Sequence, residues 1–139
     1  MKYELFNVHN EDDYQKYYPL LKSWWEGKGG AWQAIAPQFL STRGIIIKDD
    51  RAKYICAAWL YTTDSSVGVI NWIITDNDSD PKTKRKCIEF MMSRLEDYTK
   101  FIGLTMIYTV MGTNSLKKVL KKQGFIIGAN NITEFFKYV

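Results

Sequence analysis

The sequence is poor in the residues that build metal sites and disulfide frameworks. Its 139 residues include one histidine, His9, and two widely separated cysteines, Cys56 and Cys87. Ordinary zinc sites use about four such ligands at short spacings, so we expect no metal site. Both cysteines lie in apolar stretches and are interpreted as buried free thiols, with a disulfide left open.

Long hydrophobic stretches are also absent. No apolar run approaches the roughly 20 residues that span a bilayer. Residues 1–18 contain too many acids for a secretory signal peptide, so we expect a cytoplasmic protein with no membrane partner. The contents of 46% apolar and 15% aromatic residues argue against a disordered chain, and the length predicts a single domain over residues 1–139.

Positive charge is concentrated in one part of the chain. The formal net charge is +4, and residues 82–122 contain ten lysines and arginines against three acids. Such a distribution favours an anionic partner, either a phosphorylated cofactor or a nucleic acid. Any single lysine could equally belong to a solvated surface.

The hydrophobic pattern predicts strands and helices in an α/β (α+β) order. Three β-type runs between residues 43 and 75 are joined by short turns, which indicates an antiparallel meander. A strand–helix–strand unit over residues 69–110 implies a parallel crossover, so we expect a mixed sheet. The other predicted elements are a strand at 3–8, a helix reaching about residue 25, a short helix capped by Asn114 or Ser115, and a strand, turn and final strand over 125–139.

This order, with TNSLKKVLKKQGF at residues 113–125, resembles the GCN5-related N-acetyltransferase (GNAT) superfamily. In that superfamily an asparagine after the fifth strand opens a short helix that ends in Gly-Phe. Asn114 and Gly124-Phe125 reproduce the spacing. The resemblance covers essentially the whole chain and implies a mixed, mostly antiparallel twisted sheet with helices on both faces. The tryptophan-rich front half also resembles the small GNAT-like proteins of tailed bacteriophages.

The resemblance implies an acyl-CoA-dependent N-acyltransferase that moves an acetyl group from acetyl-CoA to an amine acceptor. Acetyl-CoA would lie where the fourth and fifth strands separate. Its pantetheine would pair with residues 69–75, and its pyrophosphate would lie at a loop over residues 81–86. Carried onto this chain, the cofactor-binding residues are Ile73, Ile74, Thr75, Lys82, Thr83, Lys84, Arg85, Lys86 and Asn114.

The chain departs from the family at three positions that matter for chemistry. No glycine lies between Asp76 and Cys87, so four cations take the place of a glycine-rich loop. Leu120 stands where most members have a tyrosine that protonates the departing thiolate. The fourth strand has no evident glutamate base, and Asn71 and Trp72 stand near its usual place. The catalytic candidates are therefore Asn71 and Tyr108, whose phenol is suited to proton donation.

Trp24, Trp25 and Trp32 are the candidate acceptor-binding residues. Aromatic faces suit flat or cationic substrates. Packing in the core is the competing interpretation of these side chains, because large aromatic residues in a domain of this length are mostly buried.

A non-catalytic module remains the alternative to an enzyme. In a phage setting it would bind or inhibit a host protein or nucleic acid, and acyl transfer onto modified DNA bases is a third hypothesis. The lysines of residues 117–122 would suit nucleic-acid contact, but no recognisable reading helix supports it. The chain could be a monomer or a homodimer, with FFKYV at residues 135–139 as a dimer edge.

Overall fold

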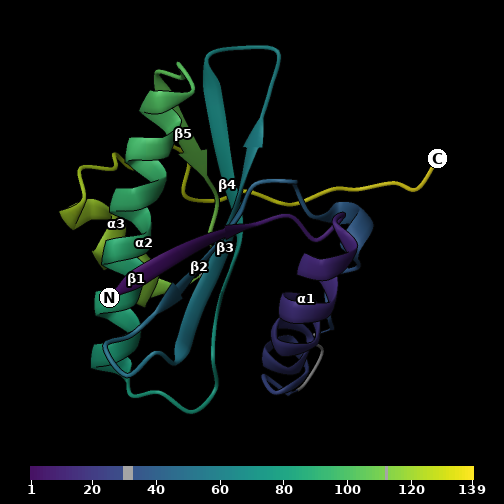
Figure 1. Cartoon of the computed structure of the whole chain (residues 1–139). Helices are drawn as coiled ribbons and strands as arrows, with labels where there is room; N and C mark the ends of the chain where they lie inside the picture. The colour runs from purple at the N-terminus through teal and green to yellow at the C-terminus, as the bar shows by residue number, and fades with distance from the viewer. Residues whose placement is uncertain (30–32, 112) are drawn as a thin grey trace.

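Five strands form one mixed sheet in the computed structural model, which describes residues 1–29, 33–111 and 113–139 (Figure 1). The first three pairings along the sheet are antiparallel, and only β4 and β5 run parallel. The predicted mixed sheet and its parallel crossover are confirmed. In order along the sheet, the strands are β1 (Lys2–Phe6), β2 (Gly44–Lys48), β3 (Tyr54–Thr62), β4 (Val67–Thr75) and β5 (Met106–Thr109).

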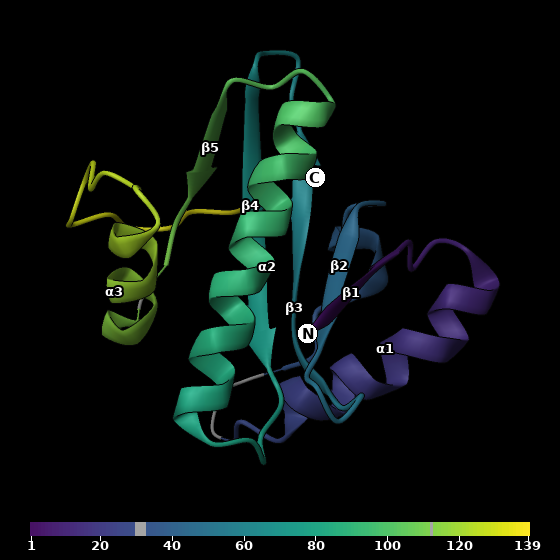
Figure 2. The ribbon, with the colours of Figure 1, turned by 60° about the vertical axis from the view of Figure 1, so that its left-hand side comes forward.

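Helices lie on both faces of the sheet (Figure 2). The long helix α2 (Pro81–Phe101) connects β4 to β5 and packs on one face, and α1 (Glu11–Glu26) packs on the other. The side chain of Asn10 caps α1 by accepting the Asp13 N–H. The remaining helical elements are the single 3-10 turn η1 (Pro37–Phe39) and the short helix α3 (Asn114–Lys122).

Two apolar layers, one on each face of the sheet, make up the core. Successive side chains of a strand point to opposite faces. In β2, Ile45 and Ile47 therefore pack toward α2, whereas Ile46 packs toward α1. The layer under α1 is largely aromatic, and its stacked pair of Trp25 and Trp59 has ring centroids 5.8 Å apart.

The prediction of a strand, turn and final strand over residues 125–139 was wrong. These residues form no strand and are almost all exposed, with Ile126 at 94% and Phe135 at 88%. The apolar pattern is typical of a strand, but a strand also needs a neighbour for its backbone hydrogen bonds. In the described chain no segment pairs with the outer edge of β5.

None of the helices in the described ranges combines the length and the apolar character needed to cross a membrane.

Candidate site between strands β4 and β5

Strands β4 and β5 pair over a short stretch and then separate. Their pairing runs from Val67–Met106 to Ile70–Thr109. Beyond it β4 continues for five residues along β3, whereas β5 ends (Figure 2). The separation leaves one edge of residues 71–75 without a neighbouring strand in the described chain.

A bulge in β4 lies at the point of separation. Ala57 faces Ile74 and Trp59 faces Asn71, so β4 has one residue more than β3 over this interval. Trp72, within the bulge, has a φ of 58°, in the left-handed region that residues other than glycine seldom adopt. The side-chain oxygen of Asn71 accepts the Trp72 N–H at 2.9 Å and helps to hold this conformation.

The ammonium group of Lys28 lies against the free edge of β4. Its Nζ donates to the carbonyl oxygen of Thr75 at 2.8 Å. The Asp76 N–H in the same peptide donates to Ile55 of β3, so the Thr75 carbonyl points away from β3, toward the gap. Burial, and then repulsion by Lys84, lower the pKa of Lys28. Two cations therefore approach each other at the end of β4.

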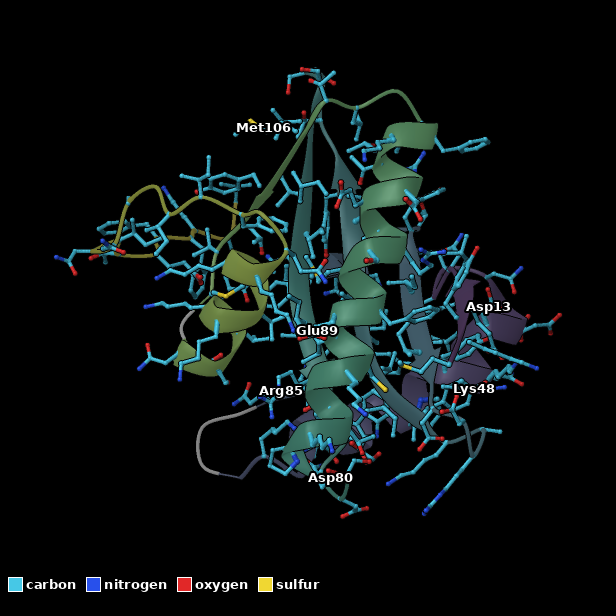
Figure 3. All side chains as sticks on the ribbon, turned by 90° about the vertical axis from the view of Figure 1, so that its left-hand side faces the viewer. Asp13, Lys48, Asp80, Arg85, Glu89 and Met106 are labelled. Atoms are coloured by element: carbon cyan, nitrogen blue, oxygen red, sulfur yellow. The ribbon has the colours of Figure 1, made fainter. Side chains whose placement is uncertain are left out.

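Residues 81–86, which the resemblance carries over as the pyrophosphate loop, form the first turns of α2. Proline at the first helical position favours an early start, since its missing N–H would have had no partner there. Asp80 is the N-cap and accepts the backbone N–H of Thr83 at 3.2 Å, as well as the Thr83 hydroxyl (Figure 3). One amide that an anion could use is thus already bonded to a carboxylate.

Four basic side chains lie on the first turns of α2: Lys82, Lys84, Arg85 and Lys86. Lys84 is half-buried and the others are exposed, and none is in a salt bridge within the described parts of the chain. Cations near a helix N-terminus are unfavourable by about 0.3–1 kcal/mol each, which an external anion would offset.

The loop before α2 is acidic, and its Asp76 side chain forms a salt bridge and hydrogen bonds within the chain. The buried Asp76 carboxylate accepts Lys53 Nζ at 2.8 Å and the Ser79 hydroxyl at 2.8 Å. Burial raises the pKa of Asp76, but these two partners outweigh burial and hold it below its usual value. This loop is unsuited to cradle a phosphate through close backbone approach, because Asp76, Asp78 and Asp80 are acids and none of its residues is glycine.

The two catalytic candidates lie on the same face of the sheet. Tyr108 is directly opposite Val69, and Asn71 follows Val69 by two residues. Since opposed residues and residues two apart share a face, both side chains are on the side that carries α1. Asn71 and Tyr108 are exposed and lie at the start of the gap.

The candidate acceptor-binding tryptophans are placed elsewhere. Trp24 and Trp25 are buried in the layer under α1, at 5% and 2% exposure. Trp32 lies outside the described residues. Aromatic residues that are partly open to solvent near the bulge are Trp72 and Tyr61, and neither was among the candidate site residues. Trp72 stands next to Asn71 in the sequence, whereas no local signal indicated Tyr61.

The third helix differs in detail from the sequence prediction. Thr113, and neither Asn114 nor Ser115, occupies the N-cap position of α3, and its side chain makes no capping hydrogen bond. Asn114 is the first helical residue and is exposed. Leu120 is buried against α2, so the position of the family's tyrosine is part of the core.

Comparison with known proteins supports the fold and leaves the family open. No protein-family model matches the sequence, and no curated protein sequence matches it significantly. A solved structure of a probable acetyltransferase superposes with a TM-score of 0.71, at 14% identity over 99% of each chain. At this identity the likeness shows a shared GNAT-like fold alone.

Two further structures show the same likeness. TTHA1254 from Thermus thermophilus has a TM-score of 0.64 and 12% identity, covering 98% of this chain and 97% of its own. The glucosamine-6-phosphate N-acetyltransferase of Arabidopsis thaliana has a TM-score of 0.57 and 13% identity, covering 99% and 100%. The fold neighbours therefore include acetyltransferases.

Proposed function

We propose that this chain is an acyl-CoA-dependent N-acyltransferase that transfers an acetyl group from acetyl-CoA to an amine. The observation that carries the proposal is the separation of β4 from β5 at the Trp72 bulge. It leaves the edge of Ile73, Ile74 and Thr75 without a neighbouring strand in the described chain, and an extended, amide-containing chain such as pantetheine could pair there if it displaced Lys28 from the Thr75 carbonyl. The acetyltransferases among the fold neighbours support this choice.

The cofactor's phosphates would be held mainly by side-chain charge. Lys84, Arg85 and Lys86 lie on the first turns of α2, and Lys84 approaches Lys28 at the end of the free β4 edge. Lys82 and Thr83 belong to the same turns, and Asn114 at the start of α3 would face the pantetheine. Lys28 adds a further cation, which no sequence motif predicted. Because Asp80 already caps the helix, ionic contacts would contribute more than backbone amides.

The reaction asks for a neutral amine and a proton for the leaving thiolate. The amine nitrogen attacks the thioester carbonyl carbon, a C–N bond forms and the C–S bond breaks. Tyr108 is the proposed donor to the thiolate, and Asn71 is proposed to hold the attacking amine or an ordered water. Acetyl-CoA supplies the activated acetyl group, and the protein supplies orientation and the proton.

A non-catalytic module is the second candidate, and a specific observation favours it. Leu120 is buried where the family places a tyrosine, and the loop before α2 is acidic. Under this alternative the fold would act as a binding or inhibitory protein, as in a phage accessory protein directed at a host protein or a nucleic acid.

Measurement of thiol release separates the two candidates. Incubation with acetyl-CoA and a mixed panel of amines should liberate free CoA thiol. The substitution Tyr108→Phe should lower kcat by about 100-fold and leave acetyl-CoA affinity unchanged, because only proton donation is lost. The control Phe101→Leu, at an exposed ring on the far end of α2, should change neither quantity. Acetyl-CoA binding without thiol release would favour the module.

A further inference from the structure

Aromatic side chains lie beside the catalytic candidates Asn71 and Tyr108, on the same face of the sheet. Tyr61 of β3 is directly opposite Val69 of β4, and Val69 is directly opposite Tyr108 of β5. Neighbouring strands are about 4.8 Å apart, and opposed residues share a face. Tyr61 and Tyr108 therefore flank Val69 on the face that carries α1, and Asn71 follows Val69 on that face.

More rings extend this face. The partly buried Trp72 packs against the layer under α1. The hydroxyl of Tyr61 donates to the carbonyl oxygen of Phe39 at 2.5 Å, and the rings of Phe39 and Tyr138 have centroids 6.4 Å apart. We define these residues with Tyr108 as the aromatic surface. Phe39, Tyr108 and Tyr138 are 43%, 50% and 76% exposed, so the surface is open to a ligand.

Neither catalytic candidate beside this surface carries a carboxylate that could deprotonate an amine, and the position near which the resemblance expects a glutamate base is Asn71. The side-chain oxygen of Asn71 is already bonded to a backbone N–H. An alkylamine such as a lysine side chain has a pKa of about 10.4 and must lose a proton before it attacks. An amino group bonded directly to an aromatic ring is neutral at pH 7, because its lone pair is delocalised into the ring.

We propose that the acceptor is an aromatic amine whose ring lies on the aromatic surface and whose amino group needs no general base. This inference rests on the proposed acetyl transfer and adds the class of acceptor. The nitrogen bonds to the acetyl carbon as the C–S bond breaks. Tyr108 gives its proton to the departing sulfur, and the proton lost by nitrogen passes through water and restores Tyr108. A flat ring also gains stacking and edge contacts from its aromatic neighbours.

Two acceptors that differ by one methylene group test the inference. In 4-methoxyaniline the nitrogen is bonded to the ring, whereas in 4-methoxybenzylamine a CH₂ group separates them. We expect kcat/KM at pH 7 to be at least about tenfold higher for the aniline, since the benzylamine is almost entirely protonated there. The aniline's rate should stay flat from about pH 6 to 8, and the benzylamine's rate should rise with pH.

A variant of the exposed ring tests the surface itself. Tyr138→Ala should raise the KM for 4-methoxyaniline by about three- to tenfold and leave the Kd of acetyl-CoA unchanged, because the proposal places the acceptor, and not the cofactor, on this ring. Phe101→Ala is the matched control, since Phe101 is an exposed ring at the end of α2 and is not part of the aromatic surface.

Calorimetry with acetyl-CoA, performed first, distinguishes the ways in which the proposals can fail. If the chain binds no acetyl-CoA, the proposed function falls. If it binds acetyl-CoA and acetylates the benzylamine as well as or better than the aniline, acetyl transfer stands and the aromatic acceptor is overturned. An unchanged KM in Tyr138→Ala, with the aniline still preferred, would overturn the assignment of the surface.

Discussion

Two groups of lysines in this molecule differ in whether the chain supplies their anion. Lys48 Nζ lies 2.7 Å from the Glu4 carboxylate, and Lys16 lies 3.7 Å from it. The hydroxyls of Tyr17 and Tyr54 donate to the same carboxylate at 2.6 and 2.8 Å. This cluster ties β1 to α1, β2 and β3, and every charge in it has a partner. It is a structural cluster.

The second group, at the gap between β4 and β5, has cations without a carboxylate. Lys28 is bonded to the Thr75 carbonyl, and Lys84 lowers the pKa of Lys28 further than burial alone does. Arg85 is exposed on the same turns of α2, whereas Lys86 approaches Asp50, whose pKa is lowered by the N-terminal ammonium and further by Lys86. Where the chain provides the anion, charge stabilises the fold. Where it does not, the cations are free to bind an anion from solution.

The largest expected effect is on the structural cluster. Glu4→Ala should lower the free energy of unfolding by about 2–3 kcal/mol, because two tyrosine hydroxyls and Lys48 lose their acceptor. Urea denaturation measures it. Glu134→Ala, at an exposed acid, is the control and should stay within about 0.5 kcal/mol.

The same cluster should respond to acid. Burial raises the pKa of Glu4, but the hydrogen bonds from Lys48, Tyr17 and Tyr54 outweigh burial and lower it to about 2 from 4.5. Its contribution is therefore complete above pH 4.5 and is lost as the pH falls toward 2. The stability difference between the unmodified chain and Glu4→Ala should shrink over this range. A constant difference would contradict the cluster's role.

The next effect concerns the cations on α2. The triple variant Lys84→Ala, Arg85→Ala and Lys86→Ala should weaken acetyl-CoA binding by about 10- to 100-fold, because three ionic contacts with phosphate are removed. Calorimetric titration measures the Kd. Lys2→Ala, Lys22→Ala and Lys100→Ala together make the charge-matched control, and equal losses in both triple variants would indicate a general charge effect without a site.

The smallest effect is expected for the lysine that the sequence did not reveal. Lys28→Ala should weaken acetyl-CoA binding by about three- to tenfold, because one partly desolvated cation is lost from the end of β4. Lys28→Arg should keep most of the affinity. If Lys28→Ala bound acetyl-CoA more tightly, Lys28 would block the gap between β4 and β5 and would not bind the cofactor.

Local pattern predicted the elements that depend on neighbouring residues. The β-type runs of β2 to β4, joined by short turns, were sufficient to predict the antiparallel meander, and the strand–helix–strand pattern over residues 69–110 was sufficient to predict the crossover. Asp80 caps the crossover helix from the position directly before it in the sequence. Each of these features depends on residues within a few positions of one another, so the sequence carries them directly.

Features that depend on distant contacts were missed. Lys28 reaches Thr75 across 47 residues of sequence, and no local pattern indicates this hydrogen bond. Trp72 adopts a positive φ with no glycine nearby, because pairing with β3 on one side and the Asn71 side chain hold it there. Whether Trp25 packs in the core or lines a site is likewise decided by its contact with Trp59.

The salt dependence of acetyl-CoA binding to the unmodified chain, measured by calorimetry, is the most direct test of side-chain charge as the phosphate ligand. We expect binding at sub-millimolar ligand in low salt, and a Kd that rises steadily as salt screens the side-chain cations. Absence of binding at about 1 mM acetyl-CoA would contradict the proposed function. Binding that is insensitive to salt would contradict the central claim that side-chain charge replaces the glycine-rich loop.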